Sequence, residues 1–332
     1  MPFARLTVGL ICTLAFAMVL SLHLGLRLYT PTQVWAALTG ANTGTDALII
    51  NGLRVPRTLA ACGVGSALAV CGVLMQSVLR NPLADPGLLG GNAGASFAVV
   101  FGFSILGITS LAALSGLALI GAAGTTTALF ALIALSRGRL TPMTLVLAGV
   151  TLSALLAALT QVLIVIDEGT MEALLFWLAG GFADRDAEVL TYGLPVVLIC
   201  IAATILLAHA LDALQVGDTA AKALGVGVSQ IRIIALGLAT VMAAICVTIA
   251  GPIGVVGLVA PHLARLCGAS QHRAQIIAAA LIGATLTVLA DIGARLVVAP
   301  QEVPVSAILA LIGAPFLVGL VRRQVRHRAV HA

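Results

Sequence analysis

Few residues of this chain carry chemistry within its apolar stretches. Asp291 precedes Arg295 by four residues, so the two side chains fall on one face of a helix. A charge at mid-membrane depth costs about 2.5–3.5 kcal/mol, and an opposite charge beside it lowers that cost. The spacing therefore predicts a structural ion pair between Asp291 and Arg295, with a proton relay as the alternative.

The sequence lacks the motifs that would let the chain hydrolyse ATP or hold a metal. Its one lysine, Lys222, is followed by alanine, whereas a phosphate-binding P-loop needs Ser or Thr there after a glycine-rich turn. H-E-x-x-H is absent, and none of the six cysteines stands in a C-x-x-C pair. We expect no catalytic residue, no cofactor and no metal site.

The composition indicates a protein that faces lipid. Hydrophobic residues make up 61% of the 332 residues and charged residues only 9%, against roughly 25% charged in a soluble domain. So few charges cannot cover a surface that faces water. The net charge of +5 could attract nucleic acid, but two Trp and two Tyr offer little base stacking. We expect contact with membrane lipid and no nucleic-acid partner.

Apolar runs of membrane-crossing length recur along the chain, and each crossing needs about 20 residues. We expect an uncleaved first span rather than a signal peptide, and a helix break at Gly251-Pro252. The pattern predicts an all-α polytopic membrane protein, a single transmembrane domain over residues 1–332. About ten spans are expected, at 6–28, 56–79, 88–108, 111–135, 143–166, 189–209, 233–251, 253–268, 274–297 and 305–321.

Small residues at helical spacing predict where spans approach closely. Ala61, Gly65 and Ala69 recur in the second span, and Gly283 and Thr287 recur in the ninth. Because lipid does not drive apolar helices together, contact through small side chains is the usual way in which spans associate. We therefore expect a tight bundle.

The basic residues predict the orientation. With the N-terminus inside, five of the 17 lysines and arginines fall in outside segments, and the other twelve fall inside. This asymmetry favours both termini in the cytoplasm. The outside five are Arg27, Arg54, Arg57, Arg185 and Arg295.

A series of motifs resembles one transporter family. They include R-N-P-L-A-D-P-G-L-L-G at 80–90 and G-L-V-A-P-H-L-A-R at 257–265. Further matches occur, in order, at 54–60, 65–69, 72–76, 94–95, 147–149, 176–181, 214–218, 250–254, 290–291 and 313–316. Together they resemble the FecCD-type permeases, the membrane subunits of importers for ferric siderophores, haem and cobalamin.

Four positions depart from the family pattern as mild changes. Val255 stands where the family commonly has Phe, Cys71 replaces a usual Ser, Asp212 a usual Asn, and Gln271 an acid. These changes affect mostly packing. They leave the implied transport role in place but weaken any inference about the substrate.

The resemblance implies a type II ABC importer permease architecture in the cell inner membrane. Its implied partners are two ATP-binding cassette ATPase subunits, a second permease, identical or homologous, and a periplasmic or lipid-anchored substrate-binding protein. The implied cargo is a ferric chelate of the iron–siderophore type, with haem or cobalamin as alternatives. An ion-coupled secondary transporter that acts without an ATPase is the alternative class, and a non-transport membrane protein is a third.

The inside loop 210–232 is the expected contact with the ATPase. Asp218 and Gly225 bracket a short helix, the acid at its N-cap and the glycine at its C-terminal stop. The resemblance implies that this helix is the coupling element that docks on the ATPase. Its expected residues are Gly217, Asp218, Ala221, Lys222, Leu224 and Gly225.

Two further sites are implied by the resemblance alone. Outer arginines that receive acidic side chains of the binding protein correspond to Arg54, Arg57 and Arg295; interfacial snorkelling, or the pair with Asp291, is the alternative. The fifth span would line the path at a two-fold interface. That nominates Leu147, Gly149, Thr151, Ser153, Thr160 and Gln161, with Thr141 and Thr144 near an inner gate.

The docking hypothesis predicts the effect of reversing two charges. Arg54→Glu together with Arg57→Glu should weaken capture of the loaded binding protein, because the guanidinium forks that pair with carboxylates are replaced by like charges. A pull-down measures the affinity. Unchanged affinity would remove this assignment.

Overall fold

The computed structural model describes residues 3–135, 142–166, 174, 177–183 and 187–330. Within these ranges every regular element is a helix. The elements are α1 (Phe3–His23), α2 (Pro31–Leu38), α3 (Thr45–Ile49), η1 (Ile50–Arg54), α4 (Val55–Leu79), η2 (Pro86–Leu89), α5 (Gly91–Ser104), α6 (Leu111–Leu135), α7 (Pro142–Ile166), α9 (Ala187–Leu206), α10 (Ala208–Val216), α11 (Asp218–Ala223), α12 (Val228–Ala250), α13 (Val256–Leu266), α14 (His272–Leu296) and α15 (Val305–Val330).

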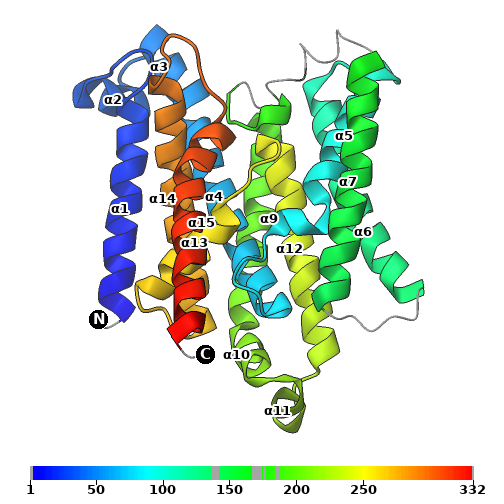
Figure 1. The fold of residues 1–332 in the computed structure, drawn as a ribbon. Helices are drawn as coiled ribbons and strands as arrows, with labels where there is room; N and C mark the ends of the chain where they lie inside the picture. The colour runs from blue at the N-terminus through cyan, green and yellow to red at the C-terminus, as the bar shows by residue number, and fades with distance from the viewer. Residues whose placement is uncertain (1–2, 136–141, 167–173, 175–176, 184–186, 331–332) are drawn as a thin grey trace.

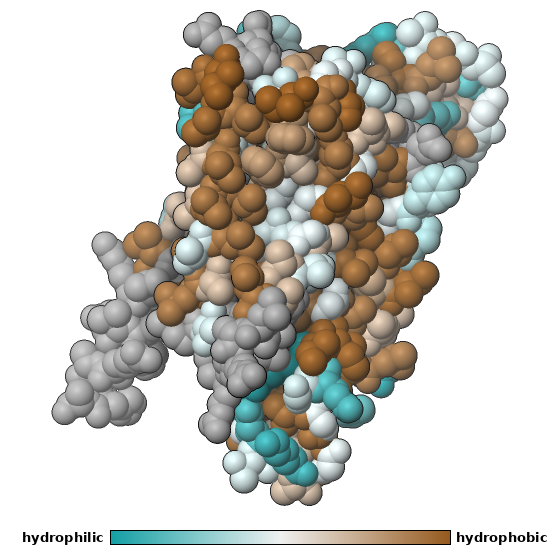
Figure 2. Space-filling model, turned by 90° about the vertical axis from the view of Figure 1, so that its right-hand side faces the viewer, coloured by the Kyte–Doolittle hydropathy of each residue, from teal (hydrophilic) through white to brown (hydrophobic). Residues whose placement is uncertain are grey.

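The long helices stand side by side as a bundle, and short helices cover its two ends (Figure 1). α2 and α3 lie at one end, and α10 and α11 project from the other. α1 starts and α15 ends on the side of α11. In Figure 2 apolar residues cover much of the visible side, and hydrophilic ones gather toward the ends, as expected for a protein that faces lipid along its length.

Seven of the described helices are long and apolar enough to cross a membrane: α1, the continuous stretch Thr45–Leu79, α6, α7, α9, α12 and α14. α5 has 14 residues and α13 has 11, and the apolar part of α15 is Val305–Phe316. Each of the ten predicted spans coincides with one helix, but three are short. A multi-pass membrane protein is therefore clear, and ten crossings stay a prediction.

α4 is the central helix of the bundle. Within the continuous stretch Thr45–Leu79, which contains α4, 78% of an 18-residue apolar segment is buried, against 6% of such a segment in α1. Its neighbours include α12, α13 and α14, so its side chains contact protein on most sides. α4 therefore connects one end of the molecule to the other through the interior.

Glycines set how closely the neighbours approach α4. A Cβ at Gly65 would clash with the backbone carbonyl of Gly283 and with the Thr287 hydroxyl, and a Cβ at Gly72 would clash with the carbonyl of Gly257. Small residues of the second and ninth spans thus meet at a close helix contact, in agreement with the expected tight bundle. It brings backbones within direct contact, where dispersion replaces the missing hydrophobic drive.

The predicted helix break after residue 250 is also confirmed. α12 ends at Ala250, and Gly251 has φ 72°, which favours glycine. The freed carbonyl of Ala250 accepts a hydrogen bond from the Gly181 N–H at 2.8 Å. Val255, with φ 75°, then starts α13 in a conformation that is unusual for a β-branched residue.

The glycine contacts give a paired prediction. Gly65→Ala should destabilise the protein by about 1–3 kcal/mol, because the new methyl group must push α14 away. Gly237→Ala is the control, since a Cβ there meets nothing within 4 Å, and its effect should stay within about 1 kcal/mol. Unfolding midpoints in detergent compare the two, and an equal change in both would contradict the contact.

Candidate functional site

The predicted coupling element is a helix pair with two glycine joints. Gly217 separates α10 from α11 with φ 127°, and Gly225 follows α11 with φ 80°. The Gly225 N–H donates to the carbonyl of Lys222 at 2.9 Å, and the Val226 N–H donates to that of Ala221 at 3.0 Å. This pattern is a Schellman C-cap, so the predicted stop at Gly225 is confirmed.

Asp218 does not cap α11, and that prediction is wrong. Gly217 holds the N-cap position, and Asp218 is the first helical residue. Its carboxylate is taken by two guanidinium groups instead. Arg232 of α12 lies 2.9 Å from Oδ1, and Arg80, which follows α4, binds the same oxygen. One acid thereby joins α11 to two long helices.

These charges act on the ionisation of Asp218. Burial alone would raise the pKa of the Asp218 carboxyl, but Arg232 and Arg80 outweigh it and hold the pKa below its usual value. A depressed pKa means that the ion pairs stabilise the fold above the titration range of a free aspartate. That contribution is lost as the pH falls through the depressed pKa.

The ion pairs of Asp218 hold α11 in place (the ionic support), and exposed apolar residues lie at the tip of this helix. Ala221 is fully buried beneath it, whereas Leu224 is 70% exposed and Lys222 is also exposed. Val216, just before Gly217, is exposed as well. An exposed apolar tip at the end of a membrane bundle is a surface suited to contact with another protein.

A second polar network anchors α10. His272, fully buried at the start of α14, has Nδ1 2.7 Å from Oδ1 of Asp212 and Nε2 2.7 Å from Oγ of Ser77. The backbone N–H of His272 also donates to Asp212 at 3.0 Å. α10, α14 and α4 are therefore linked by hydrogen-bonded side chains. This network fixes the position of α10, which directly precedes α11.

At the opposite end of α4, four charged side chains form a cluster. Arg57 lies between two acids, with Nη2 2.8 Å from Oδ1 of Asp291 and Nη1 2.9 Å from Oε2 of Glu302. Arg295 completes the cluster, its Nη2 3.0 Å from Oδ2 of Asp291. Asp291 is fully buried, and Arg57 and Arg295 are its two cationic partners.

Arg295 and Arg54 also bind the end of α1. Arg295 donates to the carbonyls of Ser21 and Leu24 and, at 2.7 Å, to Oγ of Ser21. Arg54 donates to the carbonyl of Leu22 at 2.7 Å and lies over the ring of Tyr29. These bonds satisfy carbonyls that α1 leaves free where it ends, so α1 stops at His23 rather than near residue 28.

The residues nominated for the path lie on two faces of α7. Leu147, Thr151 and Gln161 are exposed. Gly149 and Thr160 are buried, and a Cβ at Gly90 would lie 3.3 Å from the Ser153 hydroxyl, so this second face meets the start of α5. Thr144 is half-buried, and Thr141 lies outside the described residues.

Sequence reasoning missed the partners that position the coupling element, namely Arg80, Arg232, Asp212 and His272. These residues are far apart along the chain, so no local spacing links them. One signal was available: Asp212 and Asp218 are the only acids between Glu188 and Asp291. Two isolated acids among basic residues indicate specific ion pairs.

The described residues hold no group of three His, Cys, Asp or Glu side chains that could bind a metal ion. The polar clusters found instead are ion pairs and hydrogen bonds between helices. These contacts have a structural role, because they fix the ends of α4, α10 and α14 relative to one another.

Comparisons with known proteins agree with this architecture. The model of the FecCD transport family matches residues 13–323. The ferric enterobactin transport system permease protein FepD of Escherichia coli is 39% identical over 96% of this chain and 95% of its own. The probable siderophore transport system permease protein YfiZ of Bacillus subtilis is 38% identical over 89% and 90%.

A solved structure is similar over nearly the whole fold. It is described as an inward-facing conformation of a metal-chelate type ABC transporter, and it is 31% identical in sequence. The TM-score is 0.83, with 96% of this chain and 99% of the other covered. The resemblance drawn from the motifs is confirmed.

The cluster of Arg57, Asp291, Glu302 and Arg295 predicts a stability difference between two arginines. Arg57→Met should cost about 3–5 kcal/mol, because it removes a partner from a buried carboxylate. Arg27→Met is the control, since its side chain is 62% exposed and pairs with Asp46 near the surface, where a pair is worth about 0–1 kcal/mol. Unfolding midpoints decide, and similar losses in both variants would contradict the role of Arg57.

Proposed function

This chain belongs to the FecCD transport family, and we propose that it is the permease subunit of an ATP-driven importer that carries a ferric siderophore-type chelate through the inner membrane. Members of this family are the membrane permeases of ABC importers, which implies ATPase and substrate-binding partners. The chain itself is a transport subunit rather than an enzyme. The observation that carries the proposal is the exposed tip of α11 on its ionic support.

The proposed assembly contains two permease chains, identical or homologous, two ATPase subunits and one periplasmic or lipid-anchored binding protein. We place α11 and both termini in the cytoplasm. Two observations support this orientation. α1 starts and α15 ends on the side of α11, and the segments predicted to lie inside hold twelve of the 17 lysines and arginines.

In this assembly α11 receives the movement of the ATPase. Leu224 and Val216 supply the apolar contact, and Gly217 and Gly225 form the joints of the element. Asp218 transmits the displacement to α4 and α12 through its two ion pairs. Lys222 adds a positive charge to the contact surface.

Docking of the binding protein on Arg54, Arg57 and Arg295 is a separate proposal. All three guanidinium groups already have partners in the chain. An incoming carboxylate would therefore have to exchange with the existing acids, most readily with Glu302, which is 23% exposed. The charge-reversal test on Arg54 and Arg57 counts only for a variant that keeps the unfolding midpoint of the wild type.

For the path, we propose the exposed face of α7. Leu147, Thr151 and Gln161 would face the second permease and line the route, because these residues are exposed in the part of the chain that the structure describes. Gly149, Ser153 and Thr160 would hold α7 against α5. Thr144, with Thr141, is proposed to lie near the inner gate.

The geometry of Asp291 favours the importer over an ion-coupled carrier. A proton relay needs an acid that can release and take up its proton, whereas Asp291 is buried between Arg57 and Arg295. The substrate class is proposed from the relatives, whose names specify siderophore and ferric enterobactin transport.

Reconstitution tests the source of energy. Vesicles that contain the complete assembly should take up a labelled ferric chelate against its gradient only when ATP is supplied to the ATPase side. Vesicles that contain this chain alone should not, with or without a proton or sodium gradient. Uphill uptake by the chain alone would show the alternative class.

A substitution on the tip of α11 tests the coupling contact. Leu224→Glu should weaken the binding of the ATPase about tenfold or more, because it places a charge in an apolar contact. Ser229→Glu is the control, since it adds the same charge at an exposed position of α12 on the same end of the bundle. Co-purification of the ATPase measures both, and equal binding would exclude the tip.

A further inference from the structure

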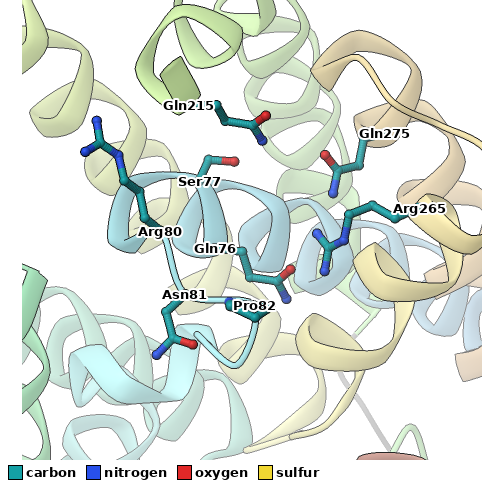
Figure 3. A pocket seen from close by; sticks show the side chains of 8 residues that line it. All are labelled: Gln76, Ser77, Arg80, Asn81, Pro82, Gln215, Arg265 and Gln275. Carbon is teal, nitrogen blue, oxygen red and sulfur yellow. The ribbon is translucent and has the colours of Figure 1, made fainter. Parts of the chain in front are cut away.

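A polar pocket lies behind the coupling element. Its volume is about 310 Å³, and its lining comes from the end of α4, the turn after it, α10, α13 and α14. Figure 3 shows its eight lining side chains: Gln76, Ser77, Arg80, Asn81, Pro82, Gln215, Arg265 and Gln275. Seven of the eight carry hydrogen-bonding groups, which is unusual inside a protein that faces lipid.

One of the two positive charges in this pocket has no counterion among the residues that line it. The lining contains two arginines and no acid. Arg80 is directed away from the others in Figure 3 and binds Asp218. Arg265, in contrast, has a buried Nη2 with no hydrogen-bond partner among the described residues. A guanidinium in such a place is costly unless something pairs with it.

Two amides face the same space. Gln76 is only 6% exposed, and it donates through Nε2 to the carbonyl of Gly257 at 3.2 Å while its Oε1 has no partner in the described chain. Gln275 is 3% exposed, and in Figure 3 its side chain converges with those of Gln76 and Arg265. One donor atom, Arg265 Nη2, and one acceptor, Gln76 Oε1, thus lack hydrogen-bond partners among the described residues at this pocket.

The chemistry and size of the pocket restrict the occupant. A fork of guanidinium donors matches two oxygens of a carboxylate or phosphate. An adjacent acceptor suits a ligand that also carries a hydroxyl or a bound water, as a phosphate group does. The volume is at the lower end of the range of about 300–1,000 Å³ for ligand pockets, so the pocket fits a small anionic group rather than a ferric chelate.

We propose that this pocket binds a phosphate group through Arg265, assisted by Gln275 and Gln76. Arg265 binds two of its oxygens, Gln275 donates to a third, and Gln76 Oε1 accepts from a protonated oxygen or from a water on it. The group comes either from inorganic phosphate in solution or from the headgroup of an anionic lipid. Since the site joins α4, α10, α13 and α14, its occupant would brace the base of α11.

Binding of inorganic phosphate tests the soluble source. The full-length chain in detergent is titrated with phosphate at constant ionic strength, with chloride as the balancing anion, and the unfolding midpoint is recorded. A ligand of the folded state raises the midpoint in a saturable way. Arg265→Gln should shift the curve about tenfold or more to higher concentration.

Two further variants complete this series. Arg273→Gln is the matched control, because Arg273 is an exposed residue at the same end of the bundle that does not line the pocket, and it should behave like the wild type. Arg265→Lys keeps the charge but not the fork, and it should bind with intermediate affinity. This variant carries the comparison if Arg265→Gln does not fold.

Lipid discs test the second source. The same variants are placed in nanodiscs of dioleoyl phosphatidylcholine, with or without dioleoyl phosphatidylglycerol. A rise in midpoint that needs both phosphatidylglycerol and Arg265 would assign the site to a lipid headgroup, and a rise with inorganic phosphate would assign it to the soluble anion. If neither probe produces a response that depends on Arg265, the proposal is overturned.

Discussion

The ion pairs of Asp218 are the interaction on which the proposed mechanism depends. An apolar helix in lipid can slide or rotate against its neighbours at small cost, because dispersion contacts have little direction. Two guanidinium groups on one carboxylate are directional, and they come from the end of α4 and from α12. A displacement of α11 must therefore move these two helices or break the pairs.

α4 carries that constraint through the molecule. Arg80 follows its one end and binds Asp218, and Arg57 near its other end binds Asp291 and Glu302. Between them, Gly65 and Gly72 bring the backbones of α14 and α13 into contact with it. The buried charges are affordable in this environment only because each one has a partner. Arg265 departs from this rule, because its Nη2 has no hydrogen-bond partner among the described residues, and the pocket beside it is the proposed binding site.

Much of the fold could be read from the sequence. The apolar runs predicted the long helices, Gly251-Pro252 predicted the break, and the small residues predicted close packing without naming the partner of each helix. Each of these signals is local and has a direct physical meaning. The helix lengths were less predictable. α1 ends early because Arg54 and Arg295 bind the carbonyls at its end, and such partners are distant in sequence.

The candidate site was predictable only in outline. The stop at Gly225 follows from its residue type, but the role of Asp218 does not, because an acid before a short helix normally caps it and here two distant arginines compete for the carboxylate. Likewise, spacing could not divide the polar residues of α7 between its two faces. That division depends on which neighbour packs beside the helix.

The amount of cargo moved per ATP hydrolysed by the Asp218→Asn variant tests the central claim most directly. The neutral side chain keeps its size but loses the charge that holds Arg80 and Arg232. In vesicles with the full assembly, we expect ATP hydrolysis to continue while uptake of the ferric chelate falls about tenfold, roughly the loss of one charge-assisted contact. An unchanged ratio of uptake to hydrolysis would contradict transmission through these ion pairs.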